Sequence, residues 1–280
     1  CVLPICGSSL APEVFRQVLG VADRYLDLEV LDSTHPESVL AKASALDPSR
    51  TLYVPATKSG GTVETLSFLK FFYRRVVHAL GSEQAGRHFV AITDPGSGLA
   101  DTARALGFRH TFLNDPNIGG RYSALSHFGL VPAALLGIDL DDLLERARLA
   151  SEQTHPAVEL GAFMGAGAAQ GRDKLTLIAS PPLAPVGAWV EQLIAESTGK
   201  EGKGIVPIEG EVLLEPSAYG SDRLFVYLRC DDALDAHADA LIAAGQPLLR
   251  IDLDDLLDLG AAFYHWELAT AIAGRSEEHT

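Results

Sequence analysis

Short β-rich segments alternate with amphipathic segments along most of this 280-residue chain. Such alternation is typical of β-α-β units, in which helices connect parallel strands. Hydrophobic residues make up 47% of the sequence, which is enough for a sizeable core. We therefore expect an α/β protein with two flavodoxin-like, doubly wound subdomains whose sheets are mainly parallel. The predicted strands are residues 2–5, 28–31, 52–56, 88–93, 110–113, 175–179, 205–208, 224–228 and 248–251.

Amphipathic periodicity and capping residues predict the helices between these strands. We place the domain boundary so that residues 1–154 form the first domain and residues 155–274 the second. The chain begins with Cys1, and its last six residues break the apolar periodicity, so we expect a fragment in which residues 275–280 are an artefactual tail. The predicted helices are residues 12–19, 36–46, 63–80, 97–106, 139–153, 157–169, 186–197, 233–244 and 255–273. A further helix is expected after the glycine turn at residues 117–123, in the apolar segment 122–136.

Composition excludes several functions. A formal net charge of -15 argues against nucleic acid as a partner. Apolar runs are too short to span a membrane, and no signal-peptide pattern is present. The three cysteines form neither a C-x-x-C pair nor a zinc-like spacing, which indicates reduced thiols and a cytoplasmic location. A phosphorylated substrate would need a local positive site against this global charge, for which the candidates are Lys58, Arg121, Lys200 and Lys203.

Residues 57–65, with the sequence TKSGGTVET, lie between a predicted strand and a predicted helix. The first turn of a helix offers unpaired N–H groups and the positive end of the helix dipole. Glycines let the backbone approach a ligand, and the hydroxyls and Lys58 add donors. The pattern predicts a phosphate-binding loop. The alternative is a simple capping turn with Thr62 as the N-cap.

This loop resembles the sugar-phosphate loop of the phosphoglucose isomerases, which have the sugar isomerase (SIS) fold. Three further motifs occur in the family's order: GSS at residues 7–9, GGRYS at residues 119–123 and ESTGK at residues 196–200. The match extends from residue 2 to about residue 274. It is closest to the isomerase half of bifunctional transaldolase/phosphoglucose isomerases, which implies two SIS subdomains and an upstream transaldolase domain.

The resemblance implies a role for each matched residue. Arg121 would stabilise an enediolate intermediate, and Glu196 would move a proton between C2 and C1. Gln192 would contact the substrate; its spacing from Glu196 places both on one helix face. From the residues alone, both Arg121 and Glu196 fit ordinary surface positions. The further residues expected to bind substrate or its phosphate are Gly7, Ser8, Thr57, Lys58, Ser59, Thr62 and Gly120.

The resemblance also implies an activity: interconversion of D-glucose 6-phosphate and D-fructose 6-phosphate in glycolysis and gluconeogenesis, by a homodimer without metal or organic cofactor. Two features depart from the family pattern. Its ring-opening histidine has no counterpart in residues 215–220, where Tyr219 is a substitute candidate, and the chain ends before the family's C-terminal lysine. Two alternatives therefore stay open: a non-catalytic module that binds sugar phosphates, and an isomerase for another hexose phosphate.

Overall fold

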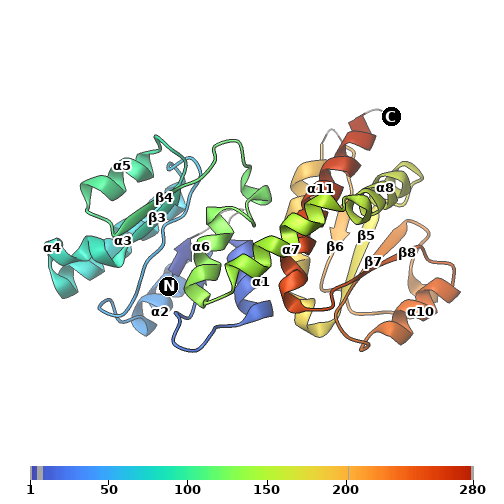
Figure 1. The fold of residues 1–280 in the computed structure, drawn as a ribbon, viewed down its shortest axis with the longest axis horizontal. Helices are drawn as coiled ribbons and strands as arrows, with labels where there is room; N and C mark the ends of the chain where they lie inside the picture. The colour runs from blue at the N-terminus through green and yellow to red at the C-terminus, as the bar shows by residue number, and fades with distance from the viewer. Residues whose placement is uncertain (1, 5–8, 201, 279–280) are drawn as a thin grey trace. The chain divides into compact units, whose positions relative to one another are not determined.

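The computed structural model describes residues 2–4, 9–200 and 202–278, with side chains described for residues 9–200 and 202–274. The chain divides into two compact units, one ending at Ile138 and the other beginning at Asp139, with Gln17–Leu19 grouped with the second. All paired strands in both units are parallel, which confirms the predicted α/β class (Figure 1). Within the described residues, no helix combines the length and the apolar character needed to cross a membrane.

The first unit contains two pairs of parallel strands. Strand β1 (Val2–Pro4) pairs with β2 (Glu29–Leu31), and β3 (Val90–Thr93) pairs with β4 (His110–Leu113). All four residues of β3 are buried, as expected of a parallel strand covered on both faces. The carboxyl ends of β3 and β4 therefore lie side by side and carry the loops that matter below.

The strand predicted at residues 52–56 is not regular. Isolated parallel bridges at Tyr53 and Ala56 join this segment to the chain at β3 and just before it. Between them stands Pro55, which has no N–H to donate to a ladder. Its carbonyl still accepts a hydrogen bond from the sheet, at 3.1 Å. The segment thus follows β3 without forming a full strand.

Helices flank these strands. The observed α3 has the predicted bounds, and its buried side includes Phe72 and Val76. Tyr53 and Phe89 stack at 5.0 Å in the same core. The helices of the first unit are α1 (Leu10–Leu19), α2 (Pro36–Ala45), α3 (Val63–Leu80), α4 (Ser82–Ala85), α5 (Gly98–Ala105) and α6 (His127–Leu136), with 3-10 turns η1 (Gly86–His88) and η2 (Gly120–Tyr122).

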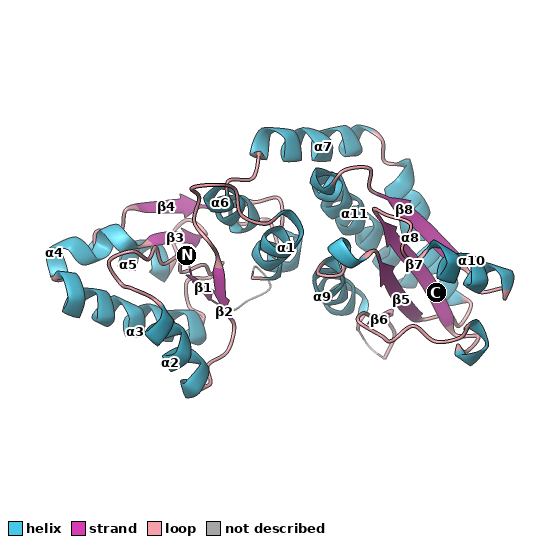
Figure 2. Ribbon diagram, turned by 90° about the horizontal axis from the view of Figure 1, so that it is seen from below, coloured by secondary structure: helices cyan, strands magenta, loops and turns pink. Residues whose placement is uncertain are grey.

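The second unit is built on one sheet with the order β6-β5-β7-β8 (Figure 2). Its strands are β5 (Lys174–Ala179), β6 (Val206–Ile208), β7 (Arg223–Arg229) and β8 (Leu248–Asp252). The interior residues of the central strands β5 and β7 are buried. This burial explains their nearly continuous apolar sequences.

Helix α11 organises the helical layer of this unit by packing against α7, α8 and α9. The rings of Trp189 on α9 and Phe263 on α11 meet edge to face at 4.6 Å. Because α7 packs on α11, the chain divides before α7, one helix earlier than the boundary expected near residue 154. The helices are α7 (Leu140–Glu152), α8 (His155–Ala169), α9 (Val186–Thr198), α10 (Asp235–Ala243) and α11 (Leu259–Glu278), with 3-10 turns η3 (Pro181–Leu183), η4 (Pro216–Ala218) and η5 (Leu256–Asp258).

Candidate functional site

The predicted phosphate loop, residues 57–62, connects the edge of β3 to the first turn of α3. The backbone N–H of Thr57 donates to the carbonyl of Ile92 at 3.0 Å, which fixes the start of the loop on the sheet. Thr62 occupies the N-cap position of α3, but its side chain makes no capping hydrogen bond. The N-cap side chain therefore supplies no acceptor to the amides of the first helical turn. An 18-residue helix thus presents the positive end of its dipole here without a side-chain cap, which suits an anion.

The hydroxyls of Thr57 and Thr62 are paired instead, with their oxygen atoms 2.7 Å apart. Thr57 is 1% exposed, whereas Thr62 is partly exposed. One hydroxyl donates to the other, and the acceptor of that bond keeps its own proton for a further partner. Because Thr62 is the one that reaches solvent, its hydroxyl is the one that can donate to a ligand.

Gly60 makes the tight shape of the loop possible. Its φ of +70° lies in the left-handed region. A Cβ atom at this position would lie 2.7 Å from the backbone nitrogen of Leu99 and 2.8 Å from Cβ of Ser97. The last residue of β3 also holds the loop: the buried Thr93 hydroxyl donates to the carbonyl of Thr57 at 2.7 Å. The loop is therefore packed against the start of α5 and rigidly shaped.

Lys58 is engaged in a way that the sequence did not reveal. Its Nζ atom donates to Oδ2 of Asp94 and to the carbonyl of Pro116, each at 2.6 Å. Asp94 directly follows β3, and Pro116 lies in the loop after β4, so Lys58 joins two loops at the carboxyl edge of the sheet. The only sequence signal for Asp94 is its place after a buried strand. The carboxylate offsets the positive charge expected of Lys58.

Arg121 lies in the turn η2 of the same unit. The hydroxyl of the buried Ser123 donates to the carbonyl of Gly120 at 2.5 Å and closes the turn. The Arg121 guanidinium carbon lies 5.6 Å from the centroid of the Tyr122 ring, a cation–π distance. Among the described residues, no atom lies within 4 Å of a Cβ built on Gly120, so the space beside the turn is open.

The second unit carries Gln192 and Glu196 on α9. Nε2 of Gln192 donates to Oε1 of Glu196 at 3.0 Å, which confirms that the two side chains share one helix face. The helix ends two residues later, where Oγ1 of the buried Thr198 donates to the carbonyl of Ile194 and accepts from the N–H of Ile205, each at 3.0 Å. The exposed Glu196 carboxylate thus stands on a well-anchored helix end.

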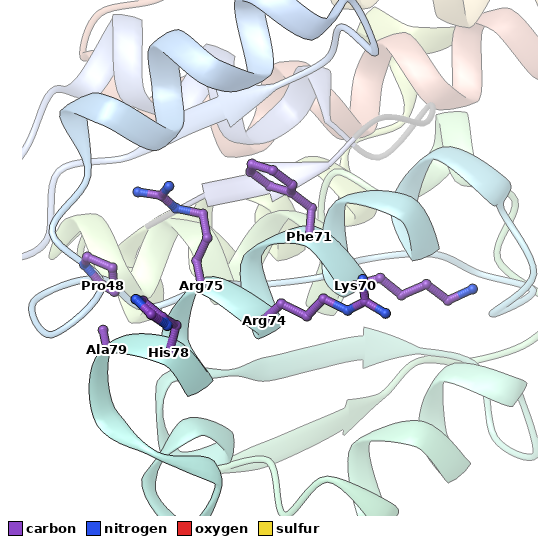
Figure 3. A pocket seen from close by; sticks show the side chains of 7 residues that line it. All are labelled: Pro48, Lys70, Phe71, Arg74, Arg75, His78 and Ala79. Atoms are coloured by element: carbon purple, nitrogen blue, oxygen red, sulfur yellow. The ribbon is translucent and has the colours of Figure 1, made fainter.

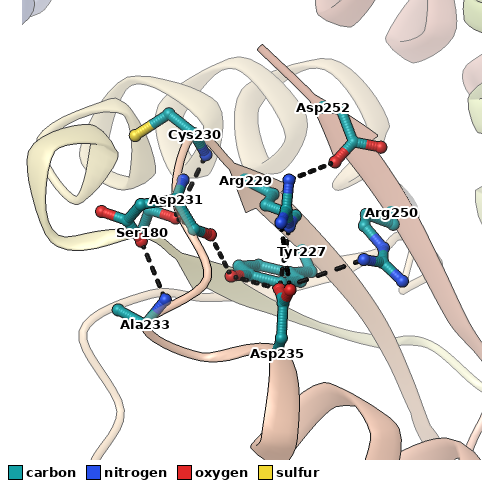
Figure 4. Close-up of polar contacts among 9 residues, drawn as sticks. All are labelled: Ser180, Tyr227, Arg229, Cys230, Asp231, Ala233, Asp235, Arg250 and Asp252. Atoms are coloured by element: carbon teal, nitrogen blue, oxygen red, sulfur yellow. Dashed lines mark hydrogen bonds and ion pairs between the residues drawn. The ribbon is translucent and has the colours of Figure 1, made fainter. Parts of the chain in front are cut away.

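Ion pairs within the second unit occupy the carboxyl edge of its sheet (Figure 4). Arg229 donates from Nε and Nη2 to the two carboxylate oxygens of Asp235, at 2.8 and 3.0 Å, and from Nη1 to Asp252 at 3.3 Å. The guanidinium hydrogen bonds hold the pKa of Asp235 below its usual range. Ser180 accepts from the N–H groups of Cys230 and Asp231 beside this network. These contacts tie α10 to the sheet and occupy the polar groups at this edge.

Other predicted positions are less informative. Gly7 and Ser8 lie outside the described residues. Tyr219 is 7% exposed, and its hydroxyl accepts from the N–H of Leu214 at 2.9 Å. This buried, hydrogen-bonded position does not fit a role in opening a sugar ring. Lys200 and Lys203 pair through their backbones just after α9.

In the part of the chain that the structure describes, no group of three His, Cys, Asp or Glu side chains is arranged to hold a metal ion.

Comparison with known proteins adds independent information. A family model described as phosphoglucose isomerase matches residues 2–157. A glucose-6-phosphate isomerase from Thermus thermophilus is 31% identical over 275 residues, which cover 94% of this chain and 63% of that protein. The chain spans 39% to 64% of the length of such curated relatives.

Two solved structures are also similar. A hypothetical protein from Thermus thermophilus has a TM-score of 0.84 and 26% identity, covering 98% of this chain and 77% of that one. A tagatose-6-phosphate ketose/aldose isomerase from Escherichia coli has a TM-score of 0.63 and 13% identity, covering 99% and 82%. The second likeness concerns the fold alone.

Proposed function

Because the chain belongs to the phosphoglucose isomerase family, we propose that the protein interconverts D-glucose 6-phosphate and D-fructose 6-phosphate. The observation that carries this proposal is the match of residues 2–157 to the family model, a stretch that includes the uncapped start of α3. The parallel α/β architecture of the chain is that of the SIS-type phosphosugar isomerases.

The substrate phosphate binds at the loop before α3. The amides of the first helical turn and the Thr62 hydroxyl donate to its oxygens. Ser59 contributes a further hydroxyl: its Oγ accepts from the N–H of Gly61 at 3.2 Å, so its proton is directed elsewhere. Thr57 orients Thr62, and Lys58 supplies an N–H donor while it stays paired with Asp94. Neutral donors therefore do most of the binding, which suits a chain with a net charge of -15.

Glu196 is the general base of the reaction. Its carboxylate removes the proton from C2 of the open-chain aldose, the C2–H electron pair forms the C1–C2 double bond, and the carbonyl oxygen takes the negative charge. The protonated Glu196 carboxyl then delivers a proton to C1, and part of the protons it carries exchange with water first; the hydroxyl proton on O2 passes to O1, which gives the ketose. Arg121 stabilises the enediolate charge, and Gln192 contacts the substrate and holds the Glu196 carboxylate. Gly120 precedes the arginine in the same turn and binds the substrate beside it.

The first alternative is a non-catalytic module that binds sugar phosphates. It is favoured by the burial of Tyr219, which leaves residues 215–220 without an evident ring-opening group. The second alternative is an isomerase for another hexose phosphate. Contacts to individual sugar hydroxyls decide between hexoses, and product analysis with mannose 6-phosphate distinguishes the two enzymes directly.

The decisive experiment measures exchange of the C2 proton of glucose 6-phosphate with deuterated water by NMR. We expect exchange with the parent chain and with Glu191→Gln, an exposed carboxylate on the same helix, and loss of exchange in Glu196→Gln with sugar-phosphate affinity retained. Exchange in Glu196→Gln would show that another group is the base. Binding without exchange in the parent chain would favour the non-catalytic module.

The same family resemblance supports three further proposals: a homodimer, an upstream transaldolase domain in the longer protein, and a cytoplasmic location. Sedimentation of this chain and of a version extended at both ends tests the first. Isomerase activity of the extended version alone would mean that segments outside this chain complete the site.

A further inference from the structure

The outer face of α3 lines a cavity of about 630 Å³ in the first unit (Figure 3). A volume of this size lies within the range of small-molecule sites in proteins. None of its lining residues belongs to the phosphate loop or to the turn at Arg121. The residues that line it are Pro48, Lys70, Phe71, Arg74, Arg75, His78 and Ala79.

This cavity concentrates positive charge in an acidic protein. Lys70, Arg74 and His78 are spaced by four residues and form one stripe along α3. Within the described part of the chain, none of these three side chains has a hydrogen bond or an ion pair. Arg75 makes one hydrogen bond, from Nη2 to the carbonyl of Ala43 at 2.7 Å. Among the described residues, no carboxylate lines the cavity, although the chain has a net charge of -15.

The hydrogen-bonding groups of the cavity limit the chemical class of ligand that can bind there. Lysine and arginine side chains donate hydrogen bonds and cannot accept them. A ligand that satisfies them must therefore bring several acceptor oxygens, and guanidinium groups match phosphate oxygens in a bidentate geometry. A sugar hydroxyl would find few acceptors among these side chains for its own proton. The charged part of the cavity therefore favours phosphate groups over the body of a hexose.

The rest of the cavity wall is apolar. Phe71, Pro48 and Ala79 contribute it, together with the aliphatic stems of Lys70 and Arg74. Aromatic rings and guanidinium planes stack on flat heterocycles. We propose that this cavity binds a nucleoside di- or triphosphate, with its phosphates on Lys70 and Arg74 and its base against the apolar wall.

The test is calorimetric titration of this chain with ADP, adenosine and inorganic phosphate. We expect ADP to bind at least about tenfold more tightly than adenosine, because each charge-assisted hydrogen bond contributes that much or more. Arg74→Gln should weaken ADP binding about tenfold. The matched control is Arg87→Gln: Arg87 is exposed, has no ion pair within the described residues and lies outside the cavity. Its ADP affinity should change by less than about twofold.

Three results would overturn the proposal. The first is an absence of ADP binding. The second is equal weakening by Arg74→Gln and Arg87→Gln, which would indicate a general charge effect. The third is displacement of ADP by fructose 6-phosphate with no effect of Arg74→Gln, which would place the nucleotide phosphates at the loop before α3. Arg74→Lys, which keeps the charge, should recover part of the affinity.

Discussion

Nζ of Lys58 lies 2.6 Å from Oδ2 of Asp94, so the cation of the phosphate loop is paired before any ligand arrives. The Asp94 side chain is 13% exposed and that of Lys58 37%. An ion pair that is partly shielded from water is harder to break than a surface pair. The pair thus fixes the loop and offsets the charge of Lys58. In the proposed site, phosphate binding therefore relies mainly on backbone amides and hydroxyls.

Lys58→Met should lower the free energy of unfolding by about 1–3 kcal/mol, because it leaves the Asp94 carboxylate without its partner. Combining it with Asp94→Asn should recover at least half of that loss. Urea unfolding of the parent, both single variants and the double variant gives the coupling between the two side chains. Simple addition of the two single effects would contradict the pair.

Gly60→Ala should lower the free energy of unfolding by about 3 kcal/mol or more, because strain at positive φ is joined by a steric clash. Gly96→Ala is the matched control: its φ is +75°, but no atom of the described residues lies within 4 Å of the added Cβ. The control should cost only about 1 kcal/mol, from the backbone term. Similar losses in both variants, measured by urea unfolding, would show that packing at Gly60 is not tight.

Thr62→Val should raise the dissociation constant for fructose 6-phosphate about tenfold, because it removes one hydrogen bond to a charged group. It should also lower the free energy of unfolding by about 1 kcal/mol, since the buried Thr57 hydroxyl loses its partner. Ser67→Ala is the control on the same helix; that exposed hydroxyl donates only to the carbonyl of Val63 within the described residues. Unchanged affinity in Thr62→Val would remove this hydroxyl from the site.

Glu267 on α11 makes stability depend on pH. Burial raises the pKa of its carboxyl from 4.5 to about 8. Between these values the folded chain keeps a proton that the unfolded chain releases, so the free energy of unfolding decreases as pH rises. Glu267→Gln cannot ionise and should be more stable than the parent at pH 7, by about 1–3 kcal/mol.

The stability gain of Glu267→Gln should shrink as pH falls toward 4.5. Urea unfolding from pH 5 to pH 8 measures it, with the exposed Glu159→Gln on α8 as the control. A gain that is constant over this pH range would show that burial does not raise the pKa of the Glu267 carboxyl.

Hydrophobic periodicity and flanking residues predicted the elements whose bounds depend on nearby residues alone. The bounds of α3 and β4 are those expected from periodicity and flanking residues. The helix expected after the glycine turn begins only at His127, because side chains before it bond to nearby backbone groups. The Ser123 hydroxyl donates to the carbonyl of Gly120, and Oγ of Ser126 accepts from the N–H of Phe128. Such competition depends on rotamers and leaves no periodic signal.

The candidate site was predicted in parts. The shared face of Gln192 and Glu196 follows from helix geometry alone. The pairing of Lys58 with Asp94 joins residues 36 positions apart, and no spacing rule reaches that far. The catalytic roles of Arg121 and Glu196 came from family resemblance and stay predictions. The fold class follows from sequence patterns, whereas the loop contacts needed the structure and the proposed chemistry needed the family resemblance.

The all-parallel order β6-β5-β7-β8 also constrains how this chain matures. Parallel neighbours cannot form through a short hairpin, and Leu175 in β5 pairs with Leu224 in β7 only after an intervening crossover. As the chain leaves the ribosome, β5 therefore emerges with both edges unsatisfied and waits for residues made much later. Such long-range pairing slows folding and exposes apolar strands in the meantime. The sheet of the second unit therefore cannot be completed before the residues of β8 have been synthesised.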